Sequence, residues 1–220
     1  MTELATTDAN NKDPQKPSPE FYRSQHKLRL SYMPWLYFEL KPAHMLWARA
    51  WQEEIQIYLQ SVETIHIGNN CFIAPEAKLF AEPGRPIIIG DNSYIAADCV
   101  LHGPTTIGNG VSINHHVTID GGRKGIIIGD HSRIAAHCNL YAFNHGLLAD
   151  PLICDQAIKS EGIFIGKDVW LGANVGVVDG VTISDHAVAG MGSQITCNIE
   201  AYHIVAGNPA RIIGDRRNKT

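Results

Sequence analysis

Aliphatic residues recur at about every sixth position between residues 67 and 200, and mostly small or polar residues separate them. A small or β-branched residue usually follows four places after each aliphatic one. The aliphatic positions fall into groups of three, which in chain order are Ile67, Ile73, Leu79; Ile89, Ile95, Leu101; Ile107, Ile113, Ile119; Ile128, Ile134, Leu140; Ile165, Leu171, Val177; and Ile183, Ala189, Ile195. A short fixed period of this kind is typical of a solenoid.

The interruptions of the repeat indicate how the chain turns. The steps 79–89, 119–128 and 140–165 carry 4, 3 and 19 extra residues, and each follows the third unit of a group. Every insertion therefore leaves from the same corner, as expected for a coil of three short strands per turn. The pattern predicts an all-β fold, a parallel β-helix of about six coils with the aliphatic side chains stacked inside it.

The other segments predict the organisation of the rest of the chain. Residues 1–20 contain three prolines and no apolar cluster, which predicts a disordered tail. Residues 21–62 predict a helical N-terminal cap, because apolar residues after Pro42 recur at spacings of three and four. Residues 63–200 then form the β-helix, with an insertion loop at 141–164, and residues 201–220 form a C-terminal segment and tail.

The predicted helix after Pro42 has two interpretations. We expect it to cover the apolar end of the first coil, which would otherwise be bare. The alternative is a membrane-surface role for its tryptophans, but Glu53 and Glu54 would be repelled by anionic lipid.

Composition excludes several classes of function. The chain has 220 residues and a formal net charge of −4, so it lacks the basic surface expected of a nucleic-acid-binding protein. No apolar run reaches the roughly 18 residues of a membrane span, and the first 20 residues contain no apolar segment of a signal peptide. We therefore expect a cytoplasmic protein.

The five cysteines fit a reducing compartment. Cys71, Cys99 and Cys138 occupy the small-residue position of their hexads, which indicates core packing rather than metal binding or disulfides. Cys154 lies in the long insertion, where we expect it to be exposed.

The long insertion is where chemistry is expected, since excursions from a rigid scaffold often carry binding and catalytic residues. It begins with the segment Ala142-Phe143-Asn144-His145-Gly146. A neutral imidazole takes a proton from a hydroxyl or amine near pH 7, so His145 is the candidate general base.

The sequence around His145 resembles a known family. The segments IGDHSRIAAHCNLYAFNHG, IGKDVWLGANV, VTISDHAVAGMGSQIT and VAGNPARII resemble the galactoside, maltose and related sugar acetyltransferases over about 85 residues. These are hexapeptide-repeat acyltransferases, so the resemblance implies a left-handed parallel β-helix, an exception to the usual crossover hand. It also implies that His145 is the general base and that the enzyme is a homotrimer with its sites between subunits.

The resemblance further implies acetyl-coenzyme A as the acyl donor. The positions that match coenzyme-contacting residues of the family are Trp170, Ala173, Met191, Thr196 and Arg211. Where the family often has a second basic residue, this chain has Gly214. Contacts to the coenzyme phosphates are therefore expected from Arg211 with Arg216, Arg217 or Lys167.

Residues that bind the acceptor are predicted on two segments. The stretch from Asn114 to Asp120 resembles the place where sugar acetyltransferases hold acceptor hydroxyls with an asparagine and an aspartate. Tyr141 and Asn144, beside His145, complete the predicted substrate-binding set. No sequence motif identifies the acceptor, so only its class is expected, a saccharide or other small molecule.

Three residues invite a metal interpretation. His116 and His137 occupy the same hexad position one coil apart and should stack, and Asp98 precedes them in the same column. Imidazole and carboxylate suit zinc, which the hexapeptide carbonic anhydrases bind through a pair of histidines five residues apart plus a third. No such pair occurs on the repeat, so we expect a ladder of corner residues and no metal.

The sequence thus predicts an acetyl-coenzyme A-dependent acetyltransferase, with O-acetylation favoured over N-acetylation and direct attack assisted by His145. A zinc-dependent hydratase of the carbonic anhydrase type and a non-catalytic assembly scaffold are the alternatives from other classes. Serine acetyltransferase is the alternative within the class, but its longer helical N-terminal region is not evident in residues 1–60.

Overall fold

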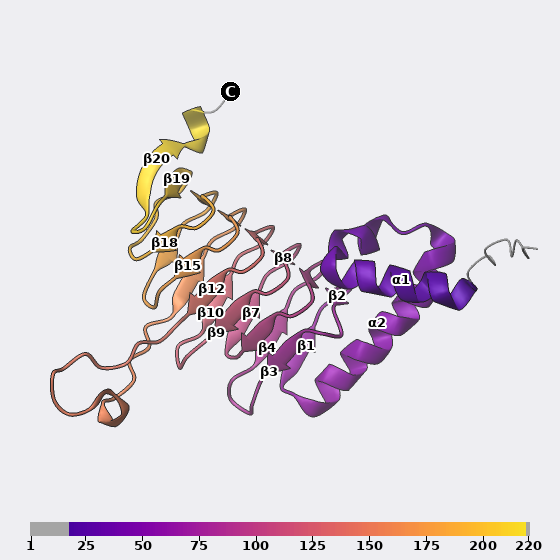
Figure 1. Cartoon of the computed structure of the whole chain (residues 1–220), viewed down its shortest axis with the longest axis horizontal. Coiled ribbons are helices and arrows are strands. Elements are labelled where there is room, and N and C mark those ends of the chain that lie inside the picture. The colour runs from indigo at the N-terminus through magenta and orange to yellow at the C-terminus, as the bar shows by residue number, and fades with distance from the viewer. Residues whose placement is uncertain (1–17, 219–220) are drawn as a thin grey trace, which may run out of the picture.

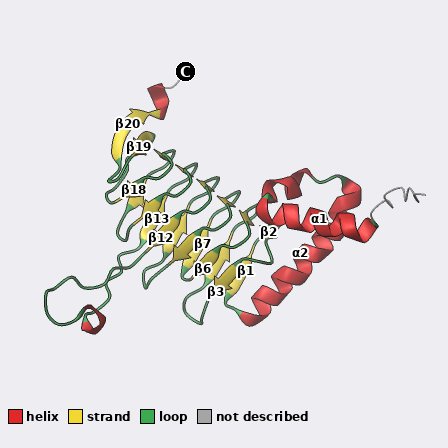
Figure 2. Ribbon diagram, in the orientation of Figure 1, coloured by secondary structure: helices red, strands yellow, loops and turns green. Residues whose placement is uncertain are grey.

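The six-residue repeat winds into a coil with three strands per turn, and each strand stacks on the equivalent strand of the preceding turn. A computed structural model describes residues 18–218. Helices occupy the N-terminal end, and the coil extends from them toward the C-terminal hairpin (Figure 1). The strands are short and the turns between them follow a regular course (Figure 2).

Three sheets form the three faces of the coil. Sheet A contains β1 (Ile65–Ile67), β4 (Ile87–Ile89), β7 (Thr105–Ile107), β10 (Ile126–Ile128), β13 (Ile163–Ile165) and β16 (Thr182–Ile183). Sheet B contains β2 (Phe72–Ile73), β5 (Tyr94–Ile95), β8 (Ser112–Ile113), β11 (Arg133–Ile134), β14 (Trp170–Leu171), β17 (Val188–Ala189), β19 (His203–Ala206) and β20 (Arg211–Asp215). Sheet C contains β3 (Lys78–Phe80), β6 (Val100–His102), β9 (Thr118–Asp120), β12 (Asn139–Tyr141), β15 (Gly176–Val177) and β18 (Gln194–Ile195).

The aliphatic positions of the repeat stack in columns, as predicted. In sheet A, Ile89 pairs with Ile107, Ile107 with Ile128, and Ile128 with Ile165. All four side chains are buried in one continuous apolar core. Burial of an aliphatic side chain contributes about 1.5–3 kcal/mol, so the columns hold consecutive coils together. The predicted fold class, a left-handed parallel β-helix with an N-terminal helical segment, is confirmed.

The insertions leave from one corner, as their spacing predicts. This C–A corner joins the end of each sheet C strand to the next sheet A strand. The longest excursion spans residues 142–162, between β12 and β13, and contains the short helix η2 (Ile153–Asp155). It projects away from the coil (Figure 1).

The N-terminal segment forms α1 (Pro19–Tyr32), η1 (Pro34–Glu39) and α2 (Pro42–Val62). The helix predicted from Pro42 is α2, and its Ile55 and Leu59 pack against the apolar core of the coil. Helix α1 lies mostly within the predicted helical cap of residues 21–62, although no separate helix was assigned there before Pro42. Its cap is Ser18, whose side chain accepts a hydrogen bond from the Phe21 N–H. Two residues of the predicted tail, Pro19 and Glu20, are therefore helical, while residues 1–17 lie outside the described part of the chain.

The C-terminal segment extends sheet B. Strand β19 pairs in parallel with β17, and β20 then pairs antiparallel with β19. The predicted polar tail from Arg216 instead begins with a short helical turn, η3 (Arg216–Asn218), in which the Arg216 side chain bonds back to the coil.

Among residues 18–218, no helix has the length and apolar character needed to cross a membrane.

Candidate functional site

His145 lies at the start of the long excursion, on the C–A corner of the fourth coil. Strand β12 ends at Tyr141, which pairs in register with Asp120 at the end of β9. The predicted residues Asp120, Tyr141, Asn144 and His145 therefore belong to one corner of the coil. His145 is exposed, and its ring lies edge-on to Phe143 with 6.1 Å between ring centroids.

The base of the excursion is clamped on both sides of His145. Asn144 and Lys159 exchange two backbone hydrogen bonds, of 2.8 and 2.9 Å. The Ser160 hydroxyl donates to the Ala142 carbonyl at 2.6 Å and accepts from the Arg123 N–H at 2.9 Å. These bonds close the loop directly behind His145, so its backbone is held against the coil. The sequence contained no readable signal for this clamp.

The outer part of the excursion is organised by Gln156. Its side-chain oxygen accepts from the Leu148 N–H at 2.9 Å, and its amide nitrogen donates to the Leu148 and Pro151 carbonyls. A Cβ on Gly146 would lie 2.4 Å from Oε1 of Gln156. Glycine is therefore needed next to His145 for the loop to close.

Asp120 belongs to a chain of titratable side chains that was not predicted from the sequence. Its carboxylate lies 3.5 Å from Nδ1 of His102, and Nε2 of His102 lies 2.8 Å from Oε1 of Glu82. The hydrogen bond with His102 lowers the pKa of the Glu82 carboxyl. His102 precedes Asp120 by one coil of 18 residues, which is the signal that could have revealed the pair.

Asn114 lies apart from the other predicted acceptor residues. It follows β8, on the B–C corner that joins sheet B to sheet C, and its side chain donates to the Ile134 carbonyl at 3.1 Å. Within one chain, Asn114 and Asp120 therefore occupy different corners, because Asn114 precedes β9 and Asp120 is the last residue of that strand. If Asn114 and Asp120 both contact one acceptor, as the sequence predicts, two subunits must contribute them.

The predicted donor-binding residues fall in three places. Trp170 stands on the outer face of sheet B, 53% exposed, next to Arg133 on the neighbouring strand. A groove of about 500 Å³ runs past these two side chains. The sequence reasoning missed Arg133, although it lies opposite Trp170 in the repeat. The groove is also lined by Val188, Ile204 and the paired Asp168 and Arg216, so Arg133 and the Trp170 ring are the groups that suit a flat anionic ligand.

Ala173 and Met191 lie on the B–C corner, on successive coils. The Gly172 N–H is used by the sheet, since it donates to the Ala189 carbonyl at 2.9 Å. The backbone N–H groups of Ala173 and Met191, by contrast, have no acceptor within the described residues. This corner therefore presents a row of backbone donors to solvent.

Thr196 and Arg211 meet at the C-terminal end of the coil. Both line a groove of about 680 Å³, together with Cys197 and His203. Thr196 and Arg211 thus lie together at the end of the coil, away from the C–A corner of the fourth coil that carries His145.

The basic residues near the C-terminus differ in their availability. Arg216 donates to the Asp168 carboxylate at 3.0 Å, Arg217 pairs with Asp215, and Lys167 lies 3.8 Å from Asp185. Hydrogen bonds from His186 and then Arg216 lower the pKa of Asp168, and those from Arg217 lower the pKa of Asp215 to about 2. Arg211 forms no ion pair with any residue from 18 to 218. Among these four basic residues, its side chain is therefore the one available to bind an anion.

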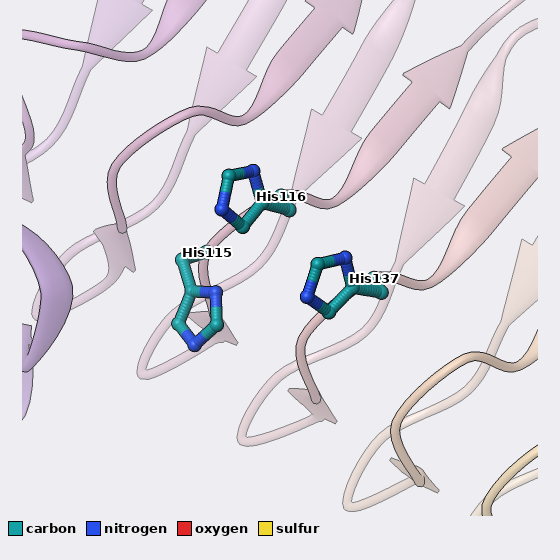
Figure 3. A group of neighbouring side chains, drawn as sticks. All are labelled: His115, His116 and His137. Carbon is teal, nitrogen blue, oxygen red and sulfur yellow. The ribbon is translucent and has the colours of Figure 1, made fainter.

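Three histidines gather on the B–C corner of the third and fourth coils (Figure 3). His116 and His137 stack as predicted, with ring centroids 4.8 Å apart and planes at 13°. The sequence reasoning missed His115, whose ring stands edge-on to both. Burial, followed by the neighbouring His116 and His137, lowers the pKa of His115. Asp98, in the same column, lies 3.7 Å from Nε2 of His116.

Two family models match segments of the coil. Residues 86–121 match "Bacterial transferase hexapeptide (six repeats)", and residues 162–197 match "Hexapeptide repeat of succinyl-transferase". Both segments lie within the six-turn coil.

Curated relatives match over shorter stretches. A chloramphenicol acetyltransferase of Agrobacterium fabrum is 44% identical over 52 residues, which is 24% of this chain and 25% of the relative. A probable macrolide acetyltransferase of Lysinibacillus sphaericus is 38% identical over 66 residues, which is 30% of this chain and 36% of the relative. The match therefore spans about a third or less of the length of these relatives.

Solved structures match over most of the coil. A variant of AntD, an N-acyltransferase from Bacillus cereus, superposes with a TM-score of 0.67 and 28% identity over 74% of this chain and 90% of its own. That structure contains dTDP-4-amino-4,6-dideoxyglucose and coenzyme A. A hexapeptide-repeat acetyltransferase from Vibrio cholerae, 23% identical with a TM-score of 0.50, covers 89% of both chains and shares the fold. By its repeat, its fold and these matches, the chain is similar to the hexapeptide-repeat acetyltransferases.

Proposed function

We propose that this protein is an acyl-coenzyme A-dependent acyltransferase that moves an acetyl group to a hydroxyl or amine of a saccharide or other small acceptor. The observation that carries the proposal is the clamped excursion, which presents an exposed imidazole, His145, at the open corner beside Asp120. The similarity to AntD, whose structure contains coenzyme A, supports the donor.

His145 acts as the general base in a direct transfer. It takes the proton of the acceptor hydroxyl or amine as that group attacks the thioester carbonyl. The tetrahedral intermediate then collapses, the carbon–sulfur bond breaks, and the coenzyme thiolate leaves and takes up a proton. No covalent enzyme intermediate is needed, because the acceptor attacks the thioester directly. Cys71, Cys99 and Cys138 are buried inside the coil, and the exposed Cys154 and Cys197 have no hydrogen bond to a base among the described residues.

The donor binds along the backbone donors of the B–C corner. The free N–H groups of Ala173 and Met191 suit the amide carbonyls of the pantetheine arm or the oxyanion of the tetrahedral intermediate. Gly172 is excluded as the oxyanion donor because the sheet already uses its N–H. Arg211, which forms no ion pair, is the proposed phosphate contact, with Thr196 beside it.

The acceptor binds at the C–A corner, near Asp120, Tyr141 and Asn144. The carboxylate of Asp120 accepts hydrogen bonds from sugar hydroxyls, and Tyr141 offers a 42% exposed ring next to it. The sequence favours a hydroxyl acceptor, whereas AntD is an N-acyltransferase. Nucleotide-linked amino sugars and their hydroxy counterparts are therefore the first acceptors to test.

The proposed donor and acceptor residues require a second subunit. His145 projects from the C–A corner, whereas Ala173 and Met191 face out from the B–C corner of the same chain. In a homotrimer, a cleft between neighbouring subunits brings one corner of each subunit together. The free cysteines and the acyl-coenzyme A donor fit a cytoplasmic location.

The decisive experiment measures release of free coenzyme thiol with a panel of amino and hydroxy sugars. We expect His145→Asn to lower kcat by about 10²–10⁴-fold, because removal of a general base has effects of that size. The matched control is His66→Asn, since His66 is an exposed histidine on sheet A of the first coil.

Several outcomes would contradict the proposal. Equal rates for wild type and His145→Asn would exclude His145 as the base. A folded protein that turns over no acceptor and does not bind coenzyme A would favour a scaffold. Loss of hydration activity on chelation of metal, with no thiol release, would favour the hydratase.

A further inference from the structure

We propose that His115, His116 and His137 form a binding site for one divalent transition-metal ion of the zinc class, separate from the acyl-transfer chemistry of His145. His115 and His116 lie on the corner after β8, and His137 lies on the same corner one coil later, after β11. One metal ion bound to all three would therefore join the third coil to the fourth.

The distances suit such a site. One ligand nitrogen from each histidine lies within 4.8 Å of the other two. Zinc–nitrogen bonds of about 2.0–2.1 Å would place the ligand nitrogens of a tetrahedral site roughly 3.4 Å apart. The ligand nitrogens therefore need to approach by at most about 1.4 Å, a change that side-chain rotations supply at the exposed His116 and His137.

A second observation points to a missing ligand. The Nδ1 atom of His115 is buried and has no hydrogen-bond partner among the described residues. Such a group is costly, since it has lost water without gaining another partner. One ring nitrogen of His116 and one of His137 turn toward His115 (Figure 3). A bound cation would satisfy the orphan nitrogen and both of these.

The surroundings add negative charge. Asp98 lies 3.7 Å from Nε2 of His116, and the hydroxyl of Tyr32 donates a hydrogen bond of 2.6 Å to the same carboxylate. Tyr32 ends helix α1, so the N-terminal segment holds this carboxylate beside the histidines. A carboxylate fixed near a group of imidazoles favours a cation there.

The ligand set selects the kind of metal. Three imidazoles suit zinc, nickel, copper or cobalt, whereas magnesium and calcium require oxygen ligands. The repeat contains no histidine pair five residues apart, so no metal was expected from the sequence. Only His116 and His137 share a column of the repeat, whereas the third ligand, His115, precedes His116 and turns back toward that column.

The test uses the full chain without an affinity tag, freed of metal by chelation and dialysis. Titration with Zn²⁺ by calorimetry is expected to give one site per chain, and Co²⁺ is expected to give the visible absorption of a low-coordinate nitrogen site. In the His137→Asn variant, we expect zinc affinity to fall more than about tenfold, because one of three ligands is lost.

The control variant is His131→Asn. His131 and His137 are both exposed and share a left-handed backbone, with φ of 61° and 62°, which asparagine also adopts. We expect His131→Asn to bind zinc like the wild type. Melting temperatures of the three metal-free proteins establish that each is folded, and zinc should raise the melting temperature of the wild type and His131→Asn only.

Two results would overturn the proposal. One is the failure of folded wild-type protein to bind Zn²⁺ at about 100 μM, a concentration at which a site of even micromolar affinity would be filled. The other is equal affinity in wild type and His137→Asn, which would place the ion on other residues.

Discussion

Ten non-glycine residues in the described part of the chain have a positive φ, and they sit at the corners of the coil. Four of them are histidines: His116, His131, His137 and His186. Asparagine, aspartate and histidine adopt this left-handed conformation more readily than most residues. A corner histidine therefore has a backbone explanation. His145 is not among these residues, so a left-handed backbone does not account for a histidine at that position.

The cysteines give a residue-scale prediction. Burial raises the pKa of Cys99 to about 12 and that of Cys138 to about 11, and it also raises the pKa of Cys71. Since the thiolate is the reactive form, these thiols stay protonated and unreactive at pH 8. Cys154 and Cys197 are exposed. We expect a thiol reagent to modify two cysteines rapidly in the native protein and all five after denaturation.

Peptide mapping of the fast-reacting thiols checks which two they are. Rapid modification of Cys138 in the folded protein would contradict the buried core, because that thiol donates to the Gly172 carbonyl inside the coil.

At the scale of elements, α2 completes the first coil. Strand β2 is the edge of sheet B, and an unpaired edge invites pairing with other chains. The buried Gln52 side chain accepts from the Ile73 N–H at 2.8 Å and donates to the Ile73 carbonyl at 3.0 Å. Its amide thus takes the place of a neighbouring strand. Trp47 and Trp51 pack in the adjoining apolar cluster, which gives both tryptophans a structural role.

Replacing Gln52 by alanine should destabilise the protein by roughly 2–3 kcal/mol, because two buried backbone groups of Ile73 lose their partner. Glu53→Ala is the control, since this neighbouring side chain is exposed and surface changes have effects within about 0.5 kcal/mol. Denaturant unfolding measures both. Equal stability of the two variants would show that water or relaxation replaces the Gln52 bonds.

At the scale of the whole molecule, the three-sided coil determines where a complete site can form. The proposed acceptor and donor residues lie on different corners of one chain, and a close-packed β-helix is too rigid to bring its own corners together. The proposed active site is therefore a property of the assembly rather than of one subunit.

Coexpression of two inactive variants tests this arrangement. His145→Asn removes the base, and Arg211→Glu impairs binding of the coenzyme phosphates. If each site takes His145 from one subunit and Arg211 from the next, random assembly of a trimer restores about one quarter of the sites. Thiol release at that level is the expected result, with the separately purified variants as controls. Mixed trimers that stay inactive would place the whole site within one chain.

The sequence alone predicts those parts of the structure that repeat along the chain. The coil, its six turns and the common corner of the insertions follow from the hexad period, because each aliphatic residue must face the one interior available. The stacking of His116 on His137 followed for the same reason. The clamped position of His145 in space did not, because residues 142–162 have no period and their course depends on bonds such as Ser160 to Ala142.

The tertiary structure alone decided how side chains meet at the corners. Glu82, His102 and Asp120 form one chain of contacts, and His115 joins the histidine column from outside it. Asn114 and Asp120 separate although only five residues lie between them. At a corner the direction of a side chain is set by local backbone turns and by the packing of adjacent coils, neither of which leaves a periodic trace in the sequence.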